Sequence, residues 1–394
     1  MVTAGDLTPT IKLFPDGKEP IHIDLFSQGG GRRGAATAGF LFGLTRFEDI
    51  KIEGASGTSA GAMANAVLVH GLAKEQTAPN HDRQDTRQLL AQLYRVVTDY
   101  SPYNVAQSLI SHTQHNVEHG QRLMFASPFA ALTPAAFVRD MVEFSRAVGD
   151  QFKTCSTAMT RAMRVSAGHK HILELVMEDV IGNTNAIRHP SAPFLVNNVV
   201  RENDDQHLLL HNRGPMGLSH IIASGALTAY LPPVEVPGVG LCRDGAQGGA
   251  NPPILDYFRL KQELMPEGRA RIAVLYNLSD PDGSLKEELK ARDPKLHSDF
   301  HTAMERQKRE LAELRSQGQD IRVIQAGLTR QQRQESLSDT DPDKMRAMFR
   351  IGVKQGEELG FKLVSQELGV DVKKLLAQRP VLMTATTNRH HAHS

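Results

Sequence analysis

Residues 57–61 combine a hydroxyl group with two glycines in the pattern Gly57-Thr58-Ser59-Ala60-Gly61. Where a strand precedes G-x-S-x-G and a helix follows it, a sharp turn lifts the serine hydroxyl out of the sheet, so that it can act as a nucleophile. Gly57 and Gly61 leave room for such a nucleophile elbow because they carry no Cβ atom. The pattern therefore predicts that Ser59 is a nucleophile; the alternative is that Ser59 only caps the helix.

Residues 29–34, Gly29-Gly30-Gly31-Arg32-Arg33-Gly34, form a second glycine-rich turn after a short apolar run. As G-x-G-x-x-G, with Glu53 near the position of a ribose-binding acid, the turn would hold the pyrophosphate of a dinucleotide. Beside a nucleophilic serine, the same backbone amides would stabilise the oxyanion of a tetrahedral intermediate. The serine pattern at the next turn favours the second use, because a dinucleotide fold has no need of it.

Asp244-Gly245-Ala246 places an acidic residue among small ones, in a segment that we expect to be a loop from residue 243 to residue 253. Small neighbours allow the carboxylate to approach another side chain closely, so Asp244 is a candidate general base. The alternative is an aspartate that bonds its own backbone in a turn.

The histidines leave a Ser-His-Asp triad open as a variant of this chemistry. His297, which follows Asp280, has the chain order of some triads, but its strongly charged surroundings favour a solvated surface position. His171 and His220 stand at the starts of expected helices, where a structural role is more common.

The elements around these residues alternate between strand and helix. Residues 21–27 and 50–53 are β-rich, and residues 35–47 and 59–72 are typical of helices. Strand–helix alternation predicts a mainly parallel sheet whose loops at the carboxyl ends of the strands carry the chemistry. Further strands are expected at residues 193–201, 208–210, 271–276 and 321–325, and further helices at 82–100, 134–148, 170–181, 218–227, 285–316 and 342–359.

Composition narrows the possible partners of the 394-residue chain. Lys and Arg number 45 against 44 Asp and Glu, so no net field attracts nucleic acid, and we expect no nucleic-acid partner.

No apolar stretch approaches the roughly 20 residues of a membrane span, and the first residues lack the pattern of a signal peptide. Two cysteines without metal-ligand spacing suit a reducing compartment. We therefore expect a cytoplasmic protein, with delivery by a non-classical secretion route left open.

Taken in order, the glycine turn, Gly57-x-Ser59-x-Gly61 and Asp244-Gly245-Ala246 resemble the motifs of the patatin-like phospholipase family. Residues 223–226 and 231–234, and Asn251-Pro252, are similar to the family's flanking stretches. The chain departs from the family pattern at Gln28, which replaces a frequent acid, and at Ala246, which replaces a frequent glycine. The interval from Asp244 to Asn251 is also one residue longer than usual.

The resemblance implies a three-layer α/β sandwich with a mainly parallel central sheet and a lipid acyl hydrolase that uses a Ser/Asp dyad. Ser59 would be the nucleophile and Asp244 the base. The substrate would be a phospholipid or another acyl ester, reached by transient contact with a membrane surface, with no cofactor and no metal. The oxyanion hole would be formed by the glycine-rich turn, at Gly29, Gly30, Gly31, Arg33 and Gly34.

Domain organisation is expected to be simple: an irregular lead-in at residues 1–20, one α/β hydrolase domain at 21–379 and a disordered, histidine-containing tail at 380–394. Residues 103–137 carry scattered apolar side chains and form either an apolar access surface or a satellite cluster on the core.

A second functional class stays open, in which the fold serves interaction as a catalytically idle or partner-regulated protein. The intact motifs favour the enzyme.

Overall fold

The computed structural model describes residues 10–77, 83–99, 171–228, 231–266, 272–278, 294–316, 321–329, 332 and 342–371. The expected helix at 134–148, the segment 103–137, Asp280 and the tail at 380–394 lie outside these residues.

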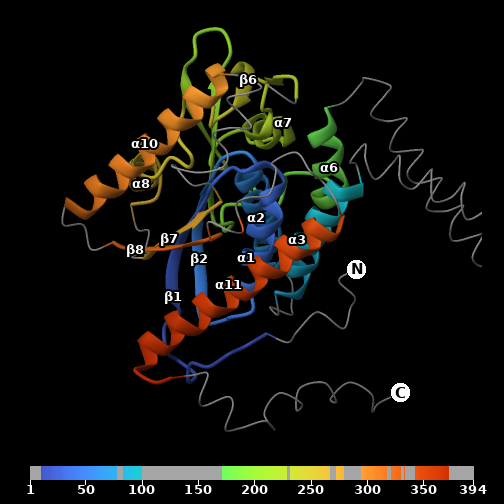
Figure 1. Cartoon of the computed structure of the whole chain (residues 1–394). Coiled ribbons are helices and arrows are strands. Elements are labelled where there is room, and N and C mark those ends of the chain that lie inside the picture. Colours follow the sequence, from blue (N-terminus) through green and yellow to red (C-terminus); the bar gives the residue numbers. More distant parts are fainter. Residues whose placement is uncertain are drawn as a thin grey trace, which may run out of the picture.

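A mixed eight-stranded sheet runs through the molecule (Figure 1). Its five parallel strands lie in the order β3-β2-β1-β7-β8, and three shorter strands extend it with antiparallel pairing. This confirms the α/β class with a mainly parallel sheet. The strands are β1 (Ile21–Ser27), β2 (Ile50–Gly57), β3 (Phe194–Arg201), β4 (His207–His211), β5 (Val234–Val236), β6 (Gly240–Asp244), β7 (Ile272–Asn277) and β8 (Arg322–Gly327).

Helices cover both faces of the sheet. Alternate residues of β1 and β7 enter different cores: Leu25 and Val274 pack in one, and Phe26 and Leu275 in the other. The first core includes residues of α1 (Gly34–Leu44), α2 (Ala60–Gln76), α3 (Gln84–Asp99), α6 (Ile172–Ile181) and α11 (Pro342–Leu368). The second is closed by α8 (Leu255–Leu264) and α10 (Pro294–Ser316). The three layers expected from the sequence are therefore present.

Several boundaries differ from those expected. Strand β2 continues to Gly57 and α11 to Leu368, because their extra residues pair or pack against neighbours that are distant in sequence. The helix expected at residues 218–227 is a short helix, α7 (Leu218–Ile222), followed by a 3₁₀ turn at Ala223–Gly225. Sequence reasoning missed β5, β6 and α8.

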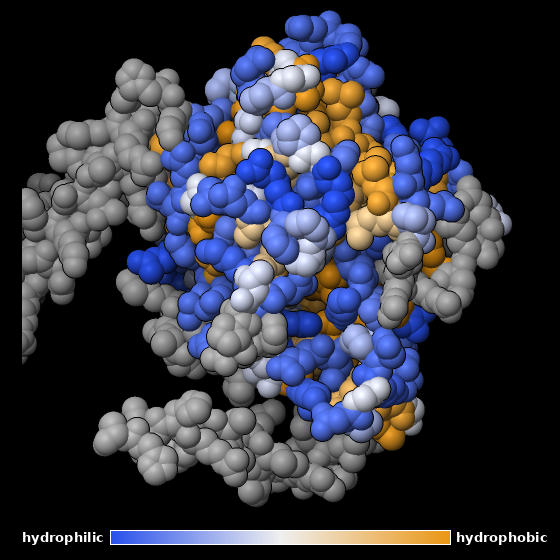
Figure 2. Space-filling view, turned by 180° about the vertical axis from the view of Figure 1, so that it is seen from behind, coloured by the Kyte–Doolittle hydropathy of each residue, from blue (hydrophilic) through white to orange (hydrophobic). Residues whose placement is uncertain are grey.

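Large hydrophobic side chains are mostly withdrawn into the two cores. In the parts of the chain that the structure describes, only Leu264 and Val370 are exposed among them. The face seen from behind is accordingly mainly hydrophilic, with smaller hydrophobic groups between polar ones (Figure 2). None of the described helices combines the length and the apolar character that crossing a membrane requires.

Helices α1 and α11 pack with their backbones almost in contact. A Cβ atom on Gly39 would lie 2.0 Å from the carbonyl oxygen of Phe349, and one on Gly352 would lie 2.0 Å from that of Ala36. Gly43 and Gly356 are equally close to the opposite backbone. Glycines spaced four residues apart on both helices thus create the notches that bring α11 onto α1, which begins directly after the glycine-rich turn.

We predict that Gly352→Ala destabilises the protein. In an exposed helix, this change would add about 1 kcal/mol of helix stability. Here the new methyl group meets backbone, so we expect a net loss of about 1–3 kcal/mol in the free energy of unfolding, measured by urea denaturation. Lys354→Ala, at an exposed position of the same helix, is the control. Equal stability of the two variants would contradict the close packing.

Candidate active site

Ser59 occupies a strained turn between β2 and α2. Its backbone has φ 55° and ψ −129°, in the left-handed region that a residue with a side chain rarely adopts. The Ser59 amide donates to Oγ of Ser224 at 3.0 Å, and the Ser224 hydroxyl donates to the carbonyl oxygen of Asn198 at 2.7 Å. A strand end, a helix start and this pair of hydrogen bonds therefore hold the turn expected of a nucleophile elbow.

The two glycines of the elbow are required by close approach. A Cβ atom on Gly57 would lie 2.6 Å from the amide nitrogen of Ala62, and one on Gly61 would lie 2.4 Å from the carbonyl oxygen of Ser27. Any side chain at either position would push the start of α2 away from the ends of β1 and β2. The G-x-S-x-G pattern thus allows α2 to begin directly behind the serine.

Asp244 lies beside Ser59. It is the last residue of β6, so the expectation that it belongs to a loop was wrong; pairing of β6 with β3 and β5 forms the strand. The Asp244 carboxylate is buried, accepts a hydrogen bond from the Ala246 amide at 2.9 Å, and interacts with the Ser59 side chain. The structure therefore brings the predicted nucleophile and the predicted base together.

Burial changes the acidity of this carboxylate. Removal from water disfavours the charged form and raises the pKa of Asp244 to about 7, although the hydrogen bonds from Ala246 and Ser59 oppose the shift. A carboxylate with a pKa near neutrality has far more affinity for a proton than a solvated one. This is the property that a general base for a serine hydroxyl needs.

The glycine-rich turn after β1 packs against the elbow. The amide of Gly29 donates to Oδ1 of Asn251 at 2.6 Å, and the amides of Arg33 and Gly34 donate to carbonyl oxygens within the turn. These three residues therefore shape the turn. Among the described residues, the amides of Gly30 and Gly31 have no hydrogen-bond acceptor, so they are the candidates for holding an oxyanion.

Glu53, the acid that a dinucleotide site would require, does not lie at the carboxyl end of its strand. Because β2 extends to Gly57, Glu53 is in the middle of the strand. Its carboxylate contacts Nδ1 of His22 on the neighbouring strand at 2.6 Å. The turn and the acid therefore do not form a common nucleotide site.

The three histidines considered for a triad do not hydrogen-bond to Ser59 or Asp244. His171 accepts the Leu173 amide at the start of α6, and His220 accepts the Gly217 amide at the start of α7, as expected for structural histidines. His297 lies on α10. Within the described ranges, no histidine hydrogen-bonds to Ser59 or Asp244, and no cluster of three metal-ligating side chains occurs.

Sequence reasoning missed the residues that support the pair. Ser224 and Asn251 lie in stretches that carry the family resemblance, yet their partners could not be read from spacing. Asn198 gave no signal, because a single asparagine in a β-rich run has no recognisable pattern. Gln28, a departure from the family pattern, donates to Oε1 of Gln307 at 2.7 Å and accepts the Leu278 amide at 2.8 Å.

No family model and no curated protein matches the chain. Among solved structures, the chain is similar to VipD. The crystal structure of VipD from Legionella pneumophila matches with a TM-score of 0.34 and 13% sequence identity, over 87% of this chain and 67% of the VipD chain. A likeness at this level leaves function to be argued from the geometry of the site.

We predict that Gly29→Ala impairs the site more than Gly30→Ala. A Cβ atom on Gly29 would lie 2.6 Å from Cβ of Ser59, whereas one on Gly30 would lie 3.0 Å from the Leu278 side chain, which needs to shift only slightly. Displacement of Ser59 should lower kcat for an ester by roughly 10²-fold. Gly214→Ala, whose new methyl group would lie no closer than 3.5 Å to any atom, is the control. Equal kcat values for the Gly29 and Gly30 variants would contradict this packing.

The raised pKa of Asp244 predicts the pH dependence of activity. A base must be ionised, so kcat/KM should rise with pH through about 7 and then level off. A solvated aspartate would give a plateau already above about pH 5. A plateau that extends down to pH 5 would therefore argue against Asp244 as the base.

The same pKa predicts the opposite trend for stability. A carboxyl group whose pKa is raised by folding binds its proton more tightly in the native state, so the native protein loses stability as pH rises from about 4 to about 7 and loses no more above that. Asp244→Asn removes this cost. The variant should be inactive, yet more stable than the natural protein at pH 8, with the difference disappearing toward pH 4. Thermal unfolding of both proteins across this pH range measures it.

Proposed function

We propose that this protein is a serine acyl hydrolase, with Ser59 as nucleophile and Asp244 as general base. The observation that carries the proposal is the interaction between the side chain of a strained elbow serine and a buried carboxylate whose pKa is about 7. Strain and a buried charge are both costly, and they persist at functional sites. Their coincidence at one pair of residues supports catalysis over a structural role.

In the proposed reaction, Asp244 accepts the hydroxyl proton as Oγ of Ser59 attacks the carbonyl carbon of an ester. The amides of Gly30 and Gly31 stabilise the negative charge that develops on the carbonyl oxygen. The C–O bond to the alcohol then breaks, Asp244 returns its proton to the leaving alcohol, and the acyl group stays on Ser59.

A water molecule completes the cycle. Asp244 takes a proton from the water as its oxygen attacks the acyl-enzyme, and the same proton returns to Ser59 when the carboxylic acid leaves. One carboxyl group thus serves as base and acid in both halves of the reaction, which its pKa near neutrality favours.

For the substrate class we propose phospholipids or other lipid acyl esters, bound during transient contact with a membrane surface. The resemblance of the three glycine-containing motifs to the patatin-like phospholipase family supports this choice. Every group in the proposed mechanism belongs to the protein, so the reaction requires neither a cofactor nor a metal ion.

We predict that the purified protein hydrolyses p-nitrophenyl butyrate in the presence of EDTA and is labelled on Ser59 by a fluorophosphonate probe. Ser59→Ala should abolish labelling and lower kcat by at least about 10³-fold. Ser191→Ala, which removes a hydroxyl from an exposed turn, is the control. A folded protein that neither reacts with the probe nor cleaves any member of a lipid ester panel would support the idle or partner-regulated alternative.

A further inference from the structure

Asn198, a fully buried residue of β3, joins the two segments that carry the proposed catalytic pair. Its side-chain Nδ2 donates to Oγ1 of Thr58, the residue before Ser59, at 3.0 Å, and to the carbonyl oxygen of Ala250, in the loop after Asp244. The Thr58 hydroxyl also donates to the Ala250 carbonyl oxygen, at 3.0 Å. One amide group therefore ties the nucleophile elbow to the loop that follows the base.

The same asparagine supports both segments in two further ways. Its backbone carbonyl accepts the hydroxyl of Ser224, the group that holds the Ser59 amide. Its side chain also lies against Gly245, where any Cβ atom would approach the amide group to 2.4 Å. The glycine after Asp244 is thus required by Asn198, which explains the Asp-Gly pair physically.

His207 on β4 sets the orientation of the Asn198 amide. Nε2 of His207 lies 2.7 Å from Oδ1 of Asn198. Because Nδ2 of Asn198 already faces the Ala250 carbonyl oxygen, Oδ1 must be the acceptor and His207 must donate from Nε2. This arrangement leaves Nδ1 of His207 as an acceptor, which requires a neutral ring; burial and the nearby Arg306 lower the pKa of His207 to about 4.

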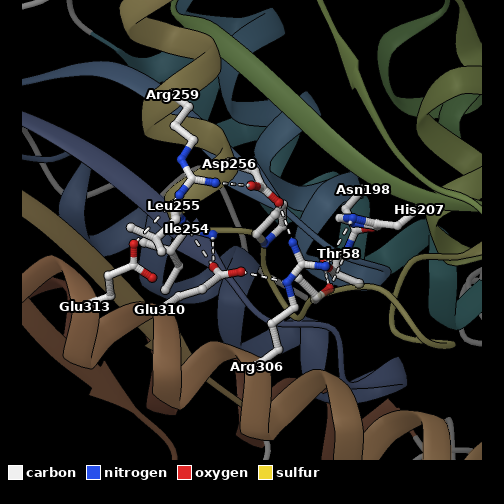
Figure 3. A network of polar contacts seen from close by, with 12 residues as sticks. Thr58, Asn198, His207, Ile254, Leu255, Asp256, Arg259, Arg306, Glu310 and Glu313 are labelled. Atoms are coloured by element: carbon white, nitrogen blue, oxygen red, sulfur yellow. Dashed lines mark hydrogen bonds and ion pairs between the residues drawn. The ribbon is translucent and has the colours of Figure 1, made fainter.

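Arg306 on α10 completes the chain of contacts (Figure 3). Its guanidinium faces Nδ1 of His207 at 3.4 Å and binds the carboxylates of Glu310, at 2.8 Å, and Asp256. Figure 3 shows this side chain rising from α10 between the two acids and the Asn198–His207 pair. The line of contacts thus runs from α10 to the residue before the nucleophile.

We propose that Asn198 is a positioning residue for the reaction proposed above. Its side-chain amide holds the turn that carries Ser59 at a fixed distance from the loop that follows Asp244. The inference rests on the proposed function. His207 and Arg306 orient that amide, and none of the three needs to touch the substrate. A displacement of about 1 Å between a nucleophile and its base can cost about 10²-fold in rate, so loss of the amide should appear mainly in kcat.

The test compares Asn198→Asp with Asn212→Asp in the full-length protein. Asn212 is also buried, and its amide makes three hydrogen bonds, all to backbone groups of residues 187, 193 and 195. We expect Asn198→Asp to lower kcat for p-nitrophenyl butyrate by roughly 10- to 100-fold with KM within about threefold. Asn212→Asp should lower the unfolding temperature at least as much, yet keep kcat within about threefold. Equal kcat losses in the two variants would overturn the inference.

A second pair of variants decides the case if Asn198→Asp does not fold. His207→Leu removes the donor to Oδ1 of Asn198, whereas His207→Gln retains an N–H that can reach it. We expect kcat to fall about tenfold in the first variant and to be largely recovered in the second; equal kcat values would overturn the inference.

The natural protein is measured first. If it is inactive and unlabelled by the probe, the proposed function fails and this inference with it; if it is active and Asn198→Asp retains its kcat, only the inference fails.

Discussion

The pairing of β3 with two different strands is the constraint on which the candidate site depends. β3 pairs in parallel with β2 up to Asn197, which faces Gly57, and pairs antiparallel with β6 from Val199, which faces Asp244. Ser59 follows Gly57 by two residues. The end of the strand before Ser59 and the end of the strand that carries Asp244 therefore lie beside positions of β3 that are only two residues apart, and a shift of either register by one residue would separate the pair.

This arrangement places two costly features in contact. A serine with positive φ and a buried, partly charged carboxylate both reduce stability. The cost is offset by the apolar cores on the two faces of the sheet, by the hydrogen bond from Ser59 to Ser224, and by the notched packing of α11 on α1. Such a balance is consistent with the proposed function, because enzyme sites often exchange stability for reactivity.

Helix α10 supports the site from the opposite face of the sheet. Glu310 accepts the amides of Ile254 and Leu255 at the start of α8, and so satisfies donors that a helix terminus leaves unpaired. Gln307 accepts the Gln28 side chain next to the glycine-rich turn. Gln28, which departs from the family pattern, thus joins the strand end before the glycine-rich turn to α10.

The sequence alone determined the class of fold and indicated the candidate chemistry. Strand–helix alternation required a mainly parallel sheet, and glycine spacing marked the two turns where backbones approach too closely for a side chain. Ser59 and Asp244 were recognisable as candidates because nucleophiles and bases need particular side chains among small neighbours. These signals are local, and each is contained within about ten residues of chain.

Tertiary structure decided how these residues meet. No pattern near Asp244 could show that it ends a strand, that burial raises its pKa to about 7, or that Asn198 and Ser224 hold its partner. Within the glycine-rich turn, only the hydrogen bonds separated the amides that shape it from those of Gly30 and Gly31. Burial and hydrogen-bond partners depend on contacts between segments far apart in the chain, so they exist only once the sheet has formed.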